Sequence, residues 1–146
     1  MSPRFVLLAC LASTLFMTGV IWFVHVVHYP LFDRVQAEAF RRYHADHTRA
    51  TGSVVILPMV VELLTSIALV ARRPEGISPW MVWLGLAAAL ISWGSTFCFS
   101  VPAHGRLAGG FDIQAHADLV RTNTIRLVSW TIHSAVLLVM TARLLR

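Results

Sequence analysis

The chain of 146 residues contains no lysine, and acidic and basic residues together make up only 13% of it. A soluble globular domain has roughly a quarter of its residues charged, so a compact water-soluble fold is not expected. Cysteine is also scarce. Cys10 and Cys98 form no CxxC pair, which gives no support to a disulfide or a thiol relay. We expect both to be small, buried, apolar side chains.

What the chain has in abundance is apolar sequence, at 57% of its residues. A helix that spans a bilayer needs about 20 mostly apolar residues. Four runs meet this requirement, at residues 5–27, 52–71, 80–101 and 124–145. They leave no room for a second domain. We therefore predict one integral membrane domain over residues 1–146, with an all-α fold built as a four-transmembrane-helix bundle.

The connections between the runs predict an up-down-up-down path. Residues 72–76 contain Pro74 and Gly76, which favour a tight turn between spans two and three. The longer connections, residues 28–51 and 102–123, should then share the opposite membrane face.

Arginine alone supplies the positive side chains behind the net charge of +5. The arginines flank the apolar runs, where they would meet lipid phosphates, so we expect the lipid bilayer and not nucleic acid as the partner. Arginine without lysine, together with many alanines, favours a bacterial protein, hence one in the inner membrane.

The first long connection is expected to hold an amphipathic helix between spans one and two. Asp33 is a suitable cap, and no glycine or proline follows it until Gly52. With a 3.6-residue period, Phe32, Tyr43 and His47 share one face and most arginines lie on the other. This helix is predicted either to lie on the membrane surface or to extend span two as one long rod.

The placement of histidine is the most informative feature of the sequence. Six of the seven histidines lie in, or within one turn of, the two long connections. Two pairs have the spacing HxxH, which makes them neighbours on a helix surface, so that one metal can accept both rings. His116 is expected to be a solvated loop residue. The residues predicted to bind a transition metal (iron, copper or zinc) or haem iron at one mouth of the bundle are His25, His28, His44, His47 and His104.

Polar residues inside the spans are predicted to be catalytic. Glu62 follows Thr51 by 11 residues and His133 follows Asn123 by 10. Both should therefore lie about 15–16 Å below the same mouth, where they can pair. An ionisable group in a span is costly unless paired and marks a functional site. We predict that Glu62 and His133 handle protons, although a structural hydrogen bond between helices is an alternative. Arg126 should bind an anionic group or stabilise developing negative charge, unless it reaches out to lipid phosphate.

Three segments carry a family resemblance: His28-Tyr29-Pro30-Leu31-Phe32, Glu62 in span two, and Asn123-Thr124-Ile125-Arg126 at the start of span four. With the length and the four spans, they make the chain similar to the small four-helix integral membrane proteins grouped with fungal anthrone oxygenases. This resemblance implies oxidation of an apolar or aromatic small molecule. In size and histidine use the chain also resembles small four-helix membrane haem proteins of the protoporphyrinogen-oxidase kind, which implies haem.

Three functions are open on the sequence alone. The first is a membrane-embedded metal- or haem-dependent oxidoreductase, whose small apolar substrate enters from the lipid between helices. The second is a protein that binds or transports a proton, a metal ion or a small anion along a polar interior containing Glu62 and His133. Because four helices leave little room for a lumen, this second function would require a homo-oligomer. The third, a structural membrane subunit, does not explain why the histidines cluster.

Overall fold

The computed structural model describes residues 2–145, and within that range the chain is helical apart from short connections. Four helical segments are long and apolar enough to cross a membrane, which confirms the all-α, four-span prediction. In order, the elements are α1 (Pro3–Phe23), the π-helical turn η1 (Val24–His28), the 3-10 turn η2 (Pro30–Arg34), α2 (Ala37–Ala71), α3 (Pro79–Ser95), the π-helical turn η3 (Thr96–Ser100), α4 (Val101–Leu107) and α5 (Ile113–Leu144).

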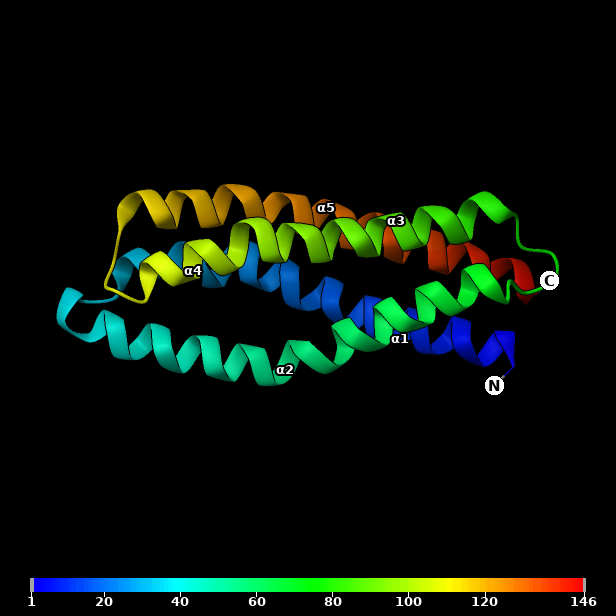
Figure 1. The fold of residues 1–146 in the computed structure, drawn as a ribbon, viewed down its shortest axis with the longest axis horizontal. Coiled ribbons are helices and arrows are strands. Elements are labelled where there is room, and N and C mark those ends of the chain that lie inside the picture. The colour runs from blue at the N-terminus through cyan, green and yellow to red at the C-terminus, as the bar shows by residue number, and fades with distance from the viewer. Residues whose placement is uncertain (1, 146) are drawn as a thin grey trace.

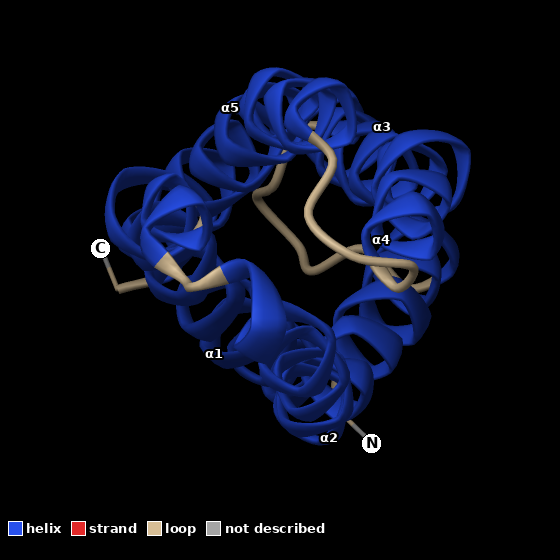
Figure 2. Ribbon diagram, turned by 90° about the vertical axis from the view of Figure 1, so that its left-hand side faces the viewer, coloured by secondary structure: helices blue, strands red, loops and turns tan. Residues whose placement is uncertain are grey.

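The four long segments lie along a common axis, with the N and C termini at the same end of the molecule (Figure 1). The connection between η2 and α2 and the loop at residues 108–112 lie at the other end, which we call the histidine mouth. Viewed end-on, the helices surround a shared centre (Figure 2). Helix α1 packs on α2 and α5, and α3 packs on α5 and α2.

Helix starts follow local sequence signals. The Ser2 hydroxyl accepts a hydrogen bond from the Phe5 amide at 3.3 Å, and Pro3 occupies the first turn of α1. In the same way, Asp112 Oδ1 accepts from the Ala115 amide at 2.7 Å and begins α5. The hairpin between α2 and α3 turns at Gly76, whose φ of 80° favours glycine.

Most residues of the two long connections are helical, which was predicted for residues 28–51 and not for residues 102–123. The amphipathic segment is the first part of α2, a single rod of 35 residues and about 52 Å. Its cap is Gln36 and not Asp33, which lies in η2. The rod runs on because a lone glycine, Gly52, weakens a helix without ending it. A hydrocarbon core is only about 30 Å thick, so the histidine end of this rod would project beyond it.

The outer surface of the bundle is apolar, and the interior contains buried polar side chains among its apolar ones. Leu57 and Ile56 are 69% and 63% exposed, whereas Glu62 is fully buried. This arrangement suits a lipid environment, where buried polar groups must find partners inside the protein. Cys10 is buried as predicted. Cys98 is exposed on η3, so the prediction for that residue is wrong: it lies on the outward face of the turn, where a thiol is apolar enough to meet lipid.

Candidate functional site

Four histidines meet at the histidine mouth, where they come from three different helical segments. His28 ends η1, His44 and His47 lie one turn apart on α2, and His104 lies on α4. The ring centre of His47 lies 4.6 Å from that of His28, 6.2 Å from that of His44 and 5.5 Å from that of His104. The centres of His44 and His104 are 5.2 Å apart. Four of the five predicted ligands are therefore in one cluster.

The rings of this cluster are joined by hydrogen bonds. His28 Nε2 lies 2.7 Å from His47 Nδ1, and His44 Nε2 lies 3.0 Å from His104 Nδ1. Thr51 Oγ1 is also 3.1 Å from His47 Nδ1, and the Tyr29 hydroxyl is 3.0 Å from His104 Nε2. In each of the two histidine–histidine pairs, one nitrogen must carry the hydrogen and the other must accept it.

A polar chain leads from this cluster to α5. Arg126 Nη2 donates to the Tyr29 hydroxyl at 3.3 Å and to Asn123 Oδ1. The side-chain nitrogen of Asn123 is 3.3 Å from His25 Nδ1. Arg126 is buried, so the alternative that it reaches out to lipid phosphate is wrong: its guanidinium is turned inward to Tyr29 and Asn123.

His25, the fifth predicted ligand, is not brought to the cluster, since its ring pairs with Asn123. The reason is the π-helical turn η1, which contains both His25 and His28. In an α-helix these residues would point about 60° apart, whereas the wider π turn sets them about 115° apart. His116 also differs from expectation. It is a half-buried residue of α5, and its Nε2 lies 2.8 Å from the carbonyl oxygen of Tyr29.

Glu62 and His133 pair deep in the bundle, which confirms the pairing predicted from their depth. His133 Nδ1 lies 2.8 Å from Glu62 Oε1, and both side chains are fully buried. Glu62 also accepts from Trp130 Nε1 at 2.8 Å and from Thr14 Oγ1 at 3.2 Å. Its two oxygens thus receive three hydrogen bonds, which is what a buried carboxylate needs.

The other side of the His133 ring faces a thiol and a glycine. His133 Nε2 is 4.0 Å from Cys10 Sγ, which in turn lies 3.4 Å from Ser66 Oγ. A Cβ atom at Gly85 would lie 3.2 Å from His133 Nε2, so only glycine leaves this ring its full space. The sequence offered no signal for Cys10 beyond its burial, because nothing in the spacing shows that α1 and α5 bring it to His133.

An apolar cavity of about 460 Å³ opens beside the histidine cluster, within the usual range for small-molecule sites. Helix α2 forms one wall, from His47 to Met59, and α3, η3 and α4 form the other. Polar side chains are gathered at its histidine end, where His47, His104, Tyr29 and Arg126 all line it. Glu62 and His133 do not line this cavity, so the predicted catalytic residues fall into two separate places.

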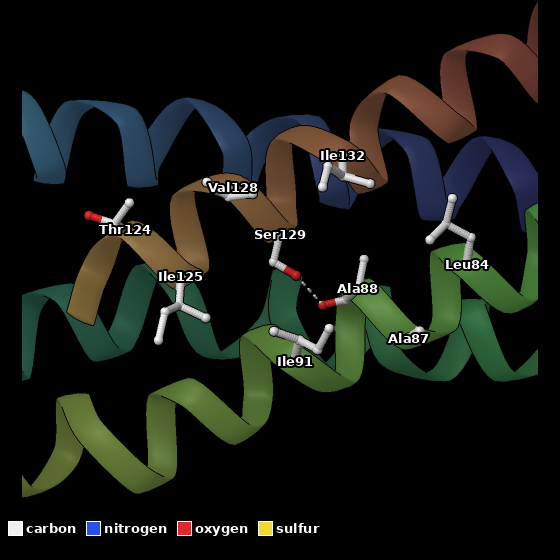
Figure 3. A pocket seen from close by; sticks show the side chains of 9 residues that line it. All are labelled: Leu84, Ala87, Ala88, Ile91, Thr124, Ile125, Val128, Ser129 and Ile132. Carbon is white, nitrogen blue, oxygen red and sulfur yellow. Dashed lines mark hydrogen bonds between the residues drawn. The ribbon is translucent and has the colours of Figure 1, made fainter. Parts of the chain in front are cut away.

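A second hollow of about 390 Å³ lies between α3 and α5. Figure 3 shows its side chains, which include Leu84, Ile91 and Ile132, around the space between the two helices. Ser129 donates its hydroxyl hydrogen to the Ala88 carbonyl at 2.7 Å, and Thr124 is the other residue with a polar side chain on the walls. With no titratable side chain on its walls, this hollow is a groove for apolar chains and not a reaction site.

No group of three or more His, Cys, Asp or Glu side chains among residues 2–145 is already arranged to hold a metal ion. At the mouth the ring nitrogens are paired with one another by hydrogen bonds instead. Two residues of this site were missed as participants by the sequence reasoning. Tyr29, which joins His104 to Arg126, was named only within the segment His28–Phe32. Trp130, which binds Glu62, was noticed only for its spacing, since Asn123, Arg126, Trp130 and His133 follow one another at 3-4-3 along span four.

Comparison of the chain with models of known families, with curated proteins and with solved structures found no match.

Proposed function

We propose that the protein is a membrane-embedded oxidoreductase. In this proposal His44, His47 and His104 bind a redox-active transition metal ion, and a small apolar molecule is oxidised in the adjoining cavity. One observation carries the proposal: His47 and His104 belong both to the histidine cluster and to the wall of the apolar cavity.

The spacing of the rings supports a three-histidine site. Three imidazoles on one ion, with metal–nitrogen bonds of about 2.0–2.1 Å, would have ring centres about 5 Å apart. The three distances here are 5.2, 5.5 and 6.2 Å. The facing nitrogens of His44 and His104, now 3.0 Å apart, would separate to about 3.3 Å. Small movements of the rings would therefore let a metal ion take the place of the hydrogen that His44 and His104 share.

Hydrogen bonds on the remaining nitrogens support the same assignment. His47 Nδ1 is held by His28 and Thr51, which leaves Nε2 for a metal. His104 Nε2 is held by the Tyr29 hydroxyl, which leaves Nδ1. Metal-binding histidines usually have their other nitrogen held in this way, because the bond fixes the orientation of the ring. His28 thus changes from a predicted ligand to a residue that orients one.

The chemistry follows from three neutral ligands and an open side. Imidazole suits iron, copper, nickel and zinc, of which iron and copper change oxidation state. Three protein ligands would leave a position for substrate, and His47 and His104 line the cavity in which that substrate would bind. Oxidation would take two electrons and two protons from the substrate and transfer them to dioxygen, which would leave as hydrogen peroxide. This function agrees with what the resemblance to anthrone oxygenases implies.

Three neighbouring rings favour a single ion over haem, whose iron would need only one or two protein ligands. The alternative of proton or ion transport has less support. Within residues 2–145 no hydrogen bond joins the chain at the mouth to the group around Glu62 and His133. A proton route across the bundle would need such a link.

The test is metal content, measured on protein purified gently without a histidine tag. His47→Ala and His104→Ala should each lower the iron or copper per chain, whereas His25→Ala and His116→Ala should not. His25 is the sharper control, since it is three residues from His28 and yet outside the cluster. Circular dichroism would establish that each variant is folded. If the wild type holds no metal, and added iron, copper or zinc neither binds nor raises its melting temperature, the proposal is wrong.

A further inference from the structure

Arg126 is a buried cation without an acidic partner. Of the arginines in residues 2–145 it alone is buried, at 8% exposure. Four ion pairs of arginine with aspartate occur elsewhere, but no carboxylate oxygen in the described chain lies within 4.0 Å of Arg126. Its Nη2 is used by Tyr29 and Asn123, while Nε, although buried, has no hydrogen-bond partner. A buried charge in a membrane protein normally has a partner.

Two more buried donors on the same cavity have no partner. Both Trp93 Nε1 and Ser100 Oγ lack a hydrogen bond, and both residues line the cavity with Arg126. Arginine and tryptophan can only donate, so the group missing from this site is an acceptor. Leaving such donors unpaired is costly, which argues for a ligand that supplies oxygen atoms.

The rest of the cavity fits an apolar body. Val55 and Met59 line it from α2, and Ile56 and Phe97 lie at its outer edge, where they are 63% and 59% exposed. Because that edge is apolar, a molecule dissolved in the bilayer can enter sideways. On α2 the wall runs from His47 to Met59, a length of about 18 Å.

We infer that the cavity binds a single-chain apolar molecule that carries a carboxylate, such as a fatty acid. Its head lies at Arg126, with its tail between α2 and η3. Arg126 Nε, which has no partner, would donate to a carboxylate oxygen, and a hydrogen bond between opposite charges selects this head over an alcohol. The inference rests on the proposed function only in taking this ligand as the substrate; the binding itself requires no metal.

The experiment uses metal-stripped protein in nanodiscs of neutral lipid, with empty nanodiscs as background. Three probes with the same tail are compared: dodecanoate, dodecanol and dodecyl phosphate. Dodecanoate should bind roughly tenfold or more tightly than dodecanol, because a hydrogen-bonded charge pair is lost with the alcohol. Arg126→Gln should abolish this preference. The matched control is Arg121→Gln, an exposed arginine on the same helix, which should keep it.

Equal binding of dodecanoate and dodecanol by the wild type would overturn the inference without any variant, and so would tighter binding of dodecyl phosphate. If Arg126→Gln does not fold, Ser100→Ala is the second test, and this variant should bind dodecanoate severalfold more weakly than the wild type does. Failure of the proposed function is separate. If the proposed function is wrong, the native protein will contain no metal. The metal-stripped protein will still bind dodecanoate more tightly than dodecanol.

Discussion

Removal of the Glu62 carboxylate should destabilise the bundle through the donors that it leaves behind. In the Glu62→Ala variant, Trp130 Nε1 and His133 Nδ1 lose the one acceptor that each has. The Thr14 hydroxyl can turn to a carbonyl of its own helix and is not counted. At about 1–3 kcal/mol for each buried unsatisfied donor, the free energy of unfolding should fall by about 2–6 kcal/mol.

A double-mutant cycle with His133→Ala isolates the contribution of the Glu62–His133 contact to stability from that of the other contacts of the two residues. That substitution leaves Glu62 with Trp130 and Thr14 as donors and should cost about 1–3 kcal/mol. Since both single variants lose the same 2.8 Å contact, the double variant should cost less than their sum by about 0.5–3 kcal/mol.

The assay is unfolding in mixed micelles of a mild detergent and sodium dodecyl sulfate, followed by circular dichroism. Thr141→Val serves as the control, because the Thr141 hydroxyl bonds only the Leu137 carbonyl of its own helix and its loss should change stability little. Strict additivity of the two single substitutions would refute the reasoning, since it would mean that the contact between Glu62 and His133 contributes nothing.

Three further predictions follow from the fold and the mouth. Single cysteines placed at Glu75 and Asp112, in a background without the native cysteines, should label from opposite sides of sealed vesicles; labelling of both from one side would contradict the four-span path. Gly85→Ala should be less stable than the matched change Gly94→Ala on the same helix, because a Cβ at Gly85 meets His133 at 3.2 Å and one at Gly94 meets nothing within 4 Å. Equal melting temperatures of the two variants would show that the His133 ring moves aside without a cost in stability. Bound metal should be released on acidification and regained when the pH is restored, as measured by elemental analysis, since protons compete for the histidine nitrogens. Occupancy that is insensitive to pH would argue for ligands other than histidine.

Much of the fold was predictable because it depends on length and period. Four apolar runs gave the four spans, and counting residues from Thr51 and Asn123 placed Glu62 and His133 at one depth, where they pair. The helix rise is constant enough for such counting over three turns. The ends of the spans were predicted less well. The sequence contains no signal that distinguishes a helix on the membrane surface from a helix that continues into α2.

The composition of the site was only partly predictable. Four of the five expected histidines cluster, because HxxH pairs and a shared mouth are properties of helices and topology. The prediction for His25 was wrong because a π-helical turn has no sequence signature and changes the direction in which side chains point. The roles of Tyr29 and Cys10 depend on which faces of two distant helices meet, and period alone does not show that.

The other π-helical turn, η3, has a consequence for insertions and deletions. A π turn holds one residue more than an α turn of similar rise, and η3 places this surplus beside the cavity, shortly before His104. Deleting one residue within η3 would restore a regular α-helix and leave both flanks facing as they do now. Deleting one residue between Val101 and His104 would instead rotate His104 by about 100° and take it away from His44. Changes of chain length in homologous sequences should therefore be tolerated at residues 96–100 and selected against in the next turn.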